Sequence, residues 1–164
     1  MKLHPLAKTS IVLVVLLALT AIAGSPPAVS PAKADSPVNW EVTLLPSNEN
    51  PPSGSELNGG GSFRATKSGV FTFQISIDNP GGETVIASHL HRGAAGTNGP
   101  VVVTLLSGAS DSRERIVIAG RGSPSPALDP EQLAREIAEN PSLFYINVHT
   151  TAHPGGAARG QLGS

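Results

Sequence analysis

The sequence contains no cysteine, and aromatic residues are scarce, with four Phe, one Trp and one Tyr among 164 residues. Without cysteine the chain can form neither disulfides nor a lipid-modified N-terminal cysteine, so its stability must come from an apolar core or from a bound metal. Charged residues make up only 14%, and no basic stripe of the kind that binds nucleic acid is present. The abundant residues are glycine (18) and proline (15), which favour a loop-rich β-protein over a helical one.

The N-terminus has the organisation of a cleavable secretory signal. Lys2 and Lys8 provide a positive start, and Ile11 to Ile22 forms an apolar run of roughly 12 residues, shorter than the ~20 that a membrane-spanning helix needs. Small residues suited to a signal peptidase follow, with cleavage favoured after Ala34 and with Ala23 as the alternative site. Residues 1–34 are therefore predicted to be a signal peptide, and an uncleaved membrane anchor is the other interpretation.

Cleavage after Ala34 leaves residues 35–164 as one domain, which is long enough to bury a proper core. Removal of the three leader lysines leaves eight basic and twelve acidic residues, a formal charge of −4. We expect this domain to be secreted or periplasmic, with no stable membrane span in its mature form and no affinity for nucleic acid.

Short apolar and β-branched runs, each closed by turn residues, predict a series of strands. Val38 to Leu44 alternates between apolar and polar residues, and Val70 to Ile77 is the clearest strand. Gly54 to Ser62 is expected to be a flexible connection. The spacing predicts an all-β fold, an antiparallel β-sandwich with Greek-key-like connections. Further strands are expected at Phe63–Thr66, Thr84–His91, Pro100–Leu106, Arg115–Ala119, Phe144–Thr150 and Ala158–Leu162.

One segment carries helical signals instead. Asp129 suits an N-cap, Pro130 the first helical position and Gln132 the third, which is a capping-box arrangement. The residues that follow place an apolar stripe at helical spacing, and Asn140-Pro141 ends it. We therefore predict one crossover helix of about ten residues, with a packing role and no direct chemistry.

The histidines are the candidate functional residues. His89 and His91 form an H-x-H on a predicted strand, where residues i and i+2 share a face with Cα atoms about 6.5–7 Å apart. Two such imidazoles can converge on one metal ion, and His149 can join them if its strand is a neighbour. His153 is the weaker candidate, because its loop can point it into solvent. Imidazole sets suit copper, with zinc as the second choice, and the alternative is a hydrogen-bonded histidine cluster without metal.

At these residues the chain resembles a known family. The run His89 to Val102 is similar to the first signature of the CHRD (chordin) domain family. The run Phe144 to Leu162 is similar to the closing signature of that family, and Leu44 to Pro52 is similar to its opening segment. The resemblance covers nearly all of residues 38–164. It implies an extracellular β-sandwich-like module, found in animal chordins and in exported microbial proteins, without an established catalytic activity in the microbial members. The residues that match the motifs are His89, His91, Asn147, His149 and Arg159.

Two function classes remain open. The first, which we favour, is a binding or structural module whose histidine face or loops engage a metal ion or an unknown extracytoplasmic protein. The second is a copper-dependent enzyme, since H-x-H on one strand and a histidine on a late strand are similar in outline to copper/zinc superoxide dismutase; without the zinc-binding set it would be a copper-only form. No catalytic residue is predicted. Asn147 is expected to cap a loop rather than to touch a ligand. Arg159 is expected to form a salt bridge at the rim of the domain, and the alternative is that it pairs with a carboxylate at the site or faces a histidine pocket.

Overall fold

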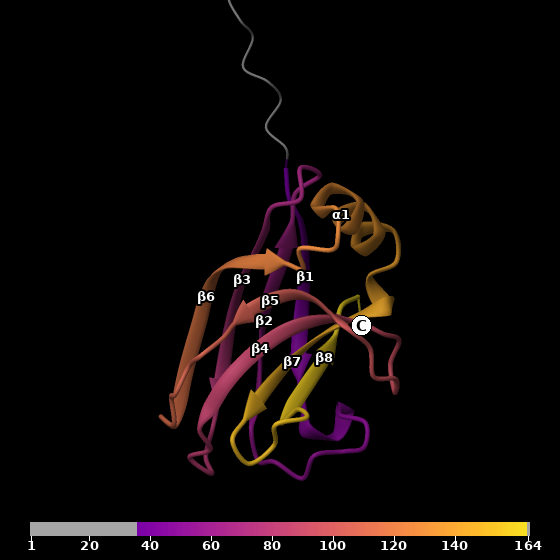
Figure 1. Ribbon diagram of the computed structural model, residues 1–164. Coiled ribbons are helices and arrows are strands. Elements are labelled where there is room, and N and C mark those ends of the chain that lie inside the picture. Colours follow the sequence, from indigo (N-terminus) through magenta and orange to yellow (C-terminus); the bar gives the residue numbers. More distant parts are fainter. Residues whose placement is uncertain (1–35, 164) are drawn as a thin grey trace, which may run out of the picture. The chain divides into compact units, whose positions relative to one another are not determined.

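A computed structural model describes residues 36–163 of the chain (Figure 1), so the predicted signal peptide lies outside the described residues. Antiparallel strands dominate this region, and a single α-helix lies between the sixth and seventh of them. Two 3-10 turns, η1 (Pro46–Asn48) and η2 (Pro141–Leu143), complete the regular structure. The elements are β1 (Val38–Leu44), β2 (Asn58–Ala65), β3 (Phe71–Asp78), β4 (Val85–Arg92), β5 (Val101–Leu106), β6 (Arg115–Pro124), α1 (Pro130–Glu139), β7 (Phe144–Thr150) and β8 (Ala158–Gln161).

The eight strands form one sheet in the order β1-β2-β3-β6-β5-β4-β7-β8, with every pairing antiparallel. Strands β3 to β6 make a Greek key, because β6 returns to lie between β5 and β3. The predicted all-β antiparallel fold with Greek-key connections and one helix is confirmed.

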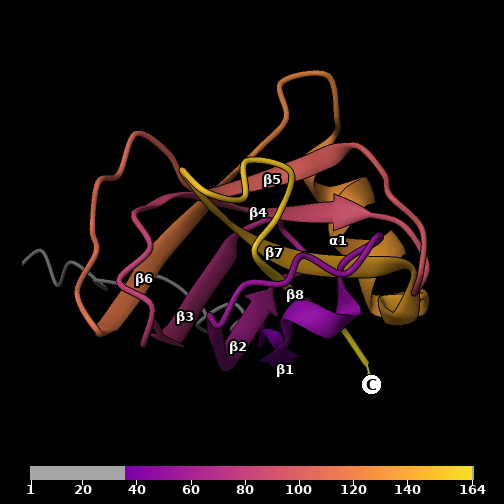
Figure 2. The same cartoon turned by 90° about the horizontal axis from the view of Figure 1, so that it is seen from below.

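The sheet is curled almost into a barrel rather than split into two separate layers (Figure 2). Strand β6 joins the two halves, since it pairs with β3 along most of its length and with β5 only at Ser123 and Pro124. The two ends of the sheet, β1 and β8, meet where Leu45 and Arg159 form two backbone hydrogen bonds with each other, at 3.0 and 3.2 Å. Curling leaves few strand edges unpaired, which protects an all-β domain against edge-to-edge association.

The core lies inside this curled sheet and follows from the period-two pattern of the strands. In β1 the side chains of Trp40, Val42 and Leu44 point inward, and the residues between them are exposed. The Trp40 ring packs against Phe63 of β2 with centroids 6.2 Å apart, and Phe63 stacks on Phe71 of β3 at 6.0 Å. Three of the scarce aromatic residues are thus grouped in one part of the core.

The expectation of a flexible connection over residues 54–62 is wrong for its second half, because β2 begins at Asn58. Gly59, Gly60 and Gly61 lie in β2, which pairs with β1 on one side and with β3 on the other. A Cβ atom at Gly59 would collide with the carbonyl of Ser76, and one at Gly61 with the carbonyl of Gln74. Glycine at these positions therefore permits close approach of the strands rather than forming a turn.

The helix is as predicted from its cap. The Asp129 carboxylate accepts a hydrogen bond from the backbone N–H of Gln132 at 2.7 Å, which satisfies one of the free donors of the first turn. Leu133, Ala134 and Ile137 are buried, so one face of α1 packs against the end of the barrel (Figure 1). Within residues 36–163 no helix has the length and apolar character needed to cross a bilayer.

Candidate metal centre

The histidines lie on the outer face of the curled sheet, opposite the core. In β4 the side chain of Leu90 is fully buried inside, so His89 and His91 on either side of it point outward. Register places His91 opposite Tyr145 of β7, and His89 opposite Asn147. Strands β4, β7 and β8 thus carry adjoining rows of polar and aromatic side chains on this outer face.

The structure brings His89, His91 and His149 together. One ring nitrogen of each lies within 4.8 Å of the other two. His89 Nδ1 and His149 Nε2 are 3.0 Å apart, and the ring centroids of His91 and His149 are 6.1 Å apart. His91 is 9% exposed, whereas His89 and His149 are half-buried, so solvent reaches the cluster mainly at His89 and His149.

Backbone carbonyls determine which nitrogens of two rings are available. His91 Nδ1 lies 2.9 Å from the carbonyl oxygen of Gly99, and His149 Nδ1 lies 3.0 Å from that of Pro154. A carbonyl only accepts, so both Nδ1 atoms carry the proton and both Nε2 atoms keep a lone pair. His89 Nδ1 donates to the lone pair of His149, but His91 Nε2 is buried and has no hydrogen-bond partner.

The electrostatics of the cluster favour neutral imidazoles. Burial, followed by the neighbouring His149 and His91, lowers the pKa of His89 to about 4. Burial is also the main cause that lowers the pKa of His91 and the pKa of His149. Neutral imidazole is the form that binds metal ions, so all three side chains are in the binding form at neutral pH.

His153 does not join the other histidines. Its side chain lies against Glu83, with Nε2 3.7 Å from the carboxylate, and its backbone N–H donates to the hydroxyl of Thr150. Glu83 also accepts hydrogen bonds from Thr150 and Ser55, each at 2.6 Å. These contacts hold the turn between β7 and β8, which supplies the Pro154 carbonyl that orients His149.

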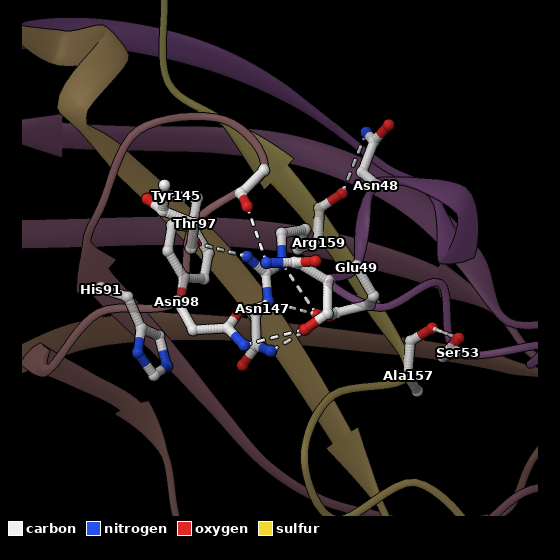
Figure 3. A network of polar contacts seen from close by, with 12 residues as sticks. Asn48, Glu49, Ser53, His91, Thr97, Asn98, Tyr145, Asn147, Ala157 and Arg159 are labelled. Atoms are coloured by element: carbon white, nitrogen blue, oxygen red, sulfur yellow. Dashed lines mark hydrogen bonds and ion pairs between the residues drawn. The ribbon is translucent and has the colours of Figure 1, made fainter.

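A buried ion pair lies beside the histidine cluster (Figure 3). Arg159 of β8 and Glu49 of the β1–β2 connection approach to 2.7 Å, with side chains only 5% and 3% exposed. The guanidinium also donates to the carbonyl of Thr97 at 2.9 Å and to the side chain of Asn98 at 2.6 Å. The Glu49 carboxylate accepts a further bond from Asn147 Nδ2 at 3.1 Å. These contacts thereby fix the β1–β2 connection and the β4–β5 loop over the outer face.

Aromatic stacking connects this ion pair to the metal-site candidates. The Arg159 guanidinium lies 4.2 Å from the centre of the Tyr145 ring, and His91 stacks on the same tyrosine with ring centroids 4.9 Å apart and planes at 6°. The Tyr145 hydroxyl accepts from the backbone N–H of Gly99, whose carbonyl binds His91. These contacts fix the orientation of the His91 ring.

The structure corrects two expectations at these positions. Asn147 lies within β7 and is 1% exposed, so it does not cap a loop. Arg159 forms a buried ion pair rather than a salt bridge at the rim. The partner, Glu49, was not a candidate; the only sequence signal for it is its position in the segment Asn48 to Pro52 that resembles the family's opening.

Comparison with known proteins identifies the family of this domain. A family model for the CHRD domain matches residues 40–162, which spans β1 to β8 and includes the histidine cluster and the ion pair. Searches of curated proteins and of solved structures each gave no significant match. The match over most of the chain, with the motif residues gathered on one face, shows that this protein belongs to the CHRD domain family.

Proposed function

We propose that this CHRD domain is a binding module that works outside the cytoplasm and holds a transition-metal ion through His89, His91 and His149. Copper is the preferred ion and zinc the alternative, because both bind sets of neutral imidazoles. The observation that carries the proposal is His91 Nε2, a buried lone pair without a hydrogen-bond donor. It belongs to a ring that has a nitrogen within 4.8 Å of nitrogens of His89 and His149. A buried acceptor without a partner is costly, and a bound cation removes that cost.

The distances between the ring nitrogens of the three histidines are close to those between nitrogens bound to one metal ion. Two nitrogens bonded at 2.0–2.1 Å to a tetrahedral ion lie about 3.3 Å apart. The His89–His149 pair is at 3.0 Å, and the 4.8 Å limit on the whole set means that the widest pair closes by at most about 1.5 Å. Rotation of one half-buried ring supplies a movement of that size, and if His89 binds through Nδ1 its proton moves to Nε2, so that the ring stays a neutral imidazole.

The test is metal binding by the purified protein and by two variants that each lose one imidazole. We expect the wild-type protein to bind one equivalent of Cu(II) and His91→Ala to lose it. His153→Ala is the matched control, because His153 lies outside the cluster, and it should bind like the wild type. Equal binding by His91→Ala and wild type, or no binding by either, refutes the proposal and leaves a hydrogen-bonded cluster.

The second candidate is a copper-dependent enzyme that resembles a copper-only superoxide dismutase. His89 and His149 are half-buried, so a small molecule can reach the outer side of the site. A superoxide dismutation assay on the copper-loaded wild-type protein separates the two functions. Activity that is lost in His91→Ala supports the enzyme, and inactivity of the loaded protein supports a binding module that presents the ion, or this face, to an extracytoplasmic partner.

A further inference from the structure

A second unpartnered atom lies beside the histidines. Three buried side-chain atoms in residues 36–163 have no hydrogen-bond partner, namely His91 Nε2, Asn147 Oδ1 and Arg92 Nε. The first two belong to neighbours on the outer face, where Asn147 lies directly opposite His89 and two residues before His149. Asn147 is therefore at the base of the cluster, next to the imidazoles.

The orientation of the Asn147 amide follows from its other neighbour. The Glu49 carboxylate is ion-paired with Arg159 and can only accept, so Asn147 must turn its Nδ2 toward it, at 3.1 Å. The oxygen Oδ1 then lies on the opposite side of the amide. In Figure 3 Asn147 lies between Glu49 and His91. The ion pair consequently holds a carbonyl oxygen toward the imidazoles.

The space between Asn147 and the three histidines therefore contains several acceptor lone pairs and, among residues 36–163, no N–H donor that lacks a partner. The protons on His91 Nδ1 and His149 Nδ1 are bound by backbone carbonyls, and that on His89 Nδ1 by His149 Nε2. Asn147 Oδ1 has no geometric hydrogen-bond donor among the described residues. Burial is the larger effect and lowers the pKa of His91, but the Asn147 side chain lies close enough to the His91 ring to accept a proton from it, which raises that pKa. A proton on His91 Nε2, shared with Asn147, is one way to satisfy both acceptors; a metal ion in the same place is the other.

We propose that Asn147 Oδ1 is a fourth ligand of this metal site, oriented by the Glu49–Arg159 pair, and that it favours Cu(II) over Cu(I). The proposal rests on the three-histidine site proposed above. An amide oxygen is a harder ligand than imidazole, and oxygen donors suit divalent ions, whereas Cu(I) prefers soft ligands. Glu49 and Arg159 are positioning residues, since neither contacts the ion.

The decisive experiment turns the side-chain amide of Asn147 around, so that its NH₂ group instead of its oxygen faces the imidazoles. In Glu49→Gln the new amide accepts from Arg159 through its oxygen and presents NH₂ to Asn147, which must turn its own NH₂ toward the imidazoles. Outer ligand-orienting residues typically change metal affinity by about 10–100-fold. We expect at least about a tenfold loss of Cu(II) affinity relative to Cu(I), equivalent to a rise of about 59 mV in the copper reduction potential.

A double variant provides the matched rescue. In Glu49→Gln/Asn147→Asp the carboxylate and the amide exchange places, so the net charge is that of the wild type. One oxygen of the relocated carboxylate accepts from the relocated amide and the other faces the ion, which should restore the preference for Cu(II). Affinities measured against competing chelators for each oxidation state give the ratio directly, and thermal unfolding of each variant verifies that it is folded.

The wild-type protein offers an independent measurement that needs no variant. Zn(II), which is diamagnetic, should shift the side-chain amide resonances of Asn147 in an NMR titration at one equivalent. The control is Asn79, another fully buried Asn, whose amide donates to the backbone carbonyls of Glu83 and Arg113 away from the site. Its resonances should not move.

The outcomes separate the two proposals. If the wild-type protein binds no metal, both are wrong. If it binds metal through the histidines, but the Asn147 amide does not shift and Glu49→Gln leaves the Cu(II)/Cu(I) ratio unchanged, then the three-histidine site is correct and the fourth ligand is not. If the variants do not fold, the titration of the wild-type protein decides.

Discussion

Substitution of Arg159 by Met tests the structural importance of the buried ion pair. The change keeps a long flexible side chain but removes the positive charge and every hydrogen bond that the guanidinium makes. It leaves the Glu49 carboxylate, which is only 3% exposed, without its counter-ion. It also removes the donors that bind the 93–100 loop through the Thr97 carbonyl and the side chain of Asn98.

The expected loss is large. Removal of one partner from a buried ion pair costs about 3–5 kcal/mol, because the remaining charge stays buried and unpaired. A domain of this size has a total stability of about 5–15 kcal/mol. Each kcal/mol lowers the unfolding temperature of a domain of this length by about 3–5 °C, so Arg159→Met should unfold about 9–25 °C below the wild type.

The assay is thermal and urea-induced unfolding, with two comparison variants. Arg113→Met removes an arginine from an ion pair with Asp111 on the surface, where the guanidinium is 73% exposed, and should have little effect. Glu49→Leu/Arg159→Met removes both buried charges and should be more stable than Arg159→Met alone. The reasoning is refuted if Arg159→Met loses no more stability than Arg113→Met, or if the double variant is the least stable.

Two further predictions concern pH and the glycine strand. In metal-free protein the free energy of unfolding should fall as the pH drops from about 6.5 toward about 4, because unfolded imidazoles take up protons at their ordinary pKa of 6.5, whereas the folded-state pKa of His89 is about 4. The urea concentration at the midpoint of unfolding should therefore change less between pH 7 and pH 4.5 in His89→Gln than in the wild type. The same change in both proteins would show that His89 is not the cause. Gly61→Ala should lose about 1–3 kcal/mol of stability, because the new Cβ collides with the Gln74 carbonyl. Gly155→Ala, where a Cβ has no neighbour within 4 Å, should unfold at the wild-type temperature, and identical behaviour of the two variants would count against close strand approach.

The local elements were predictable from the sequence because their signals lie within a few residues. Alternation defines β1, the β-branched and aromatic run from Val70 to Ile77 defines β3, and the capping residues at Asp129 define α1. The glycine segment of β2 was not predictable, since glycine lacks the side chains that produce an alternating pattern. The second half of β6 was missed for a similar reason, because its sequence from Gly120 to Pro124 is typical of a turn.

The candidate site divides in the same way. Two histidines at i and i+2 of a strand must share a face, so the pairing of His89 with His91 follows from the sequence alone. The addition of His149 and the separation of His153 depend on which strand lies beside β4 and on where the following turn is held. Glu49 lies 110 residues from Arg159 in the chain, and no local pattern connects them.

By itself, then, the sequence determined most of the strands, the helix, the family resemblance and the shared face of His89 and His91, because each depends on the short-range periodicity of the backbone or on a local motif. The tertiary structure alone decided that the sheet curls onto itself, that Glu49 pairs with Arg159 and that Asn147 donates a hydrogen bond to Glu49. Those contacts join residues far apart in the chain. They form because the loops over β4, β7 and β8 exclude water, and each buried polar group there must find its partner within the protein.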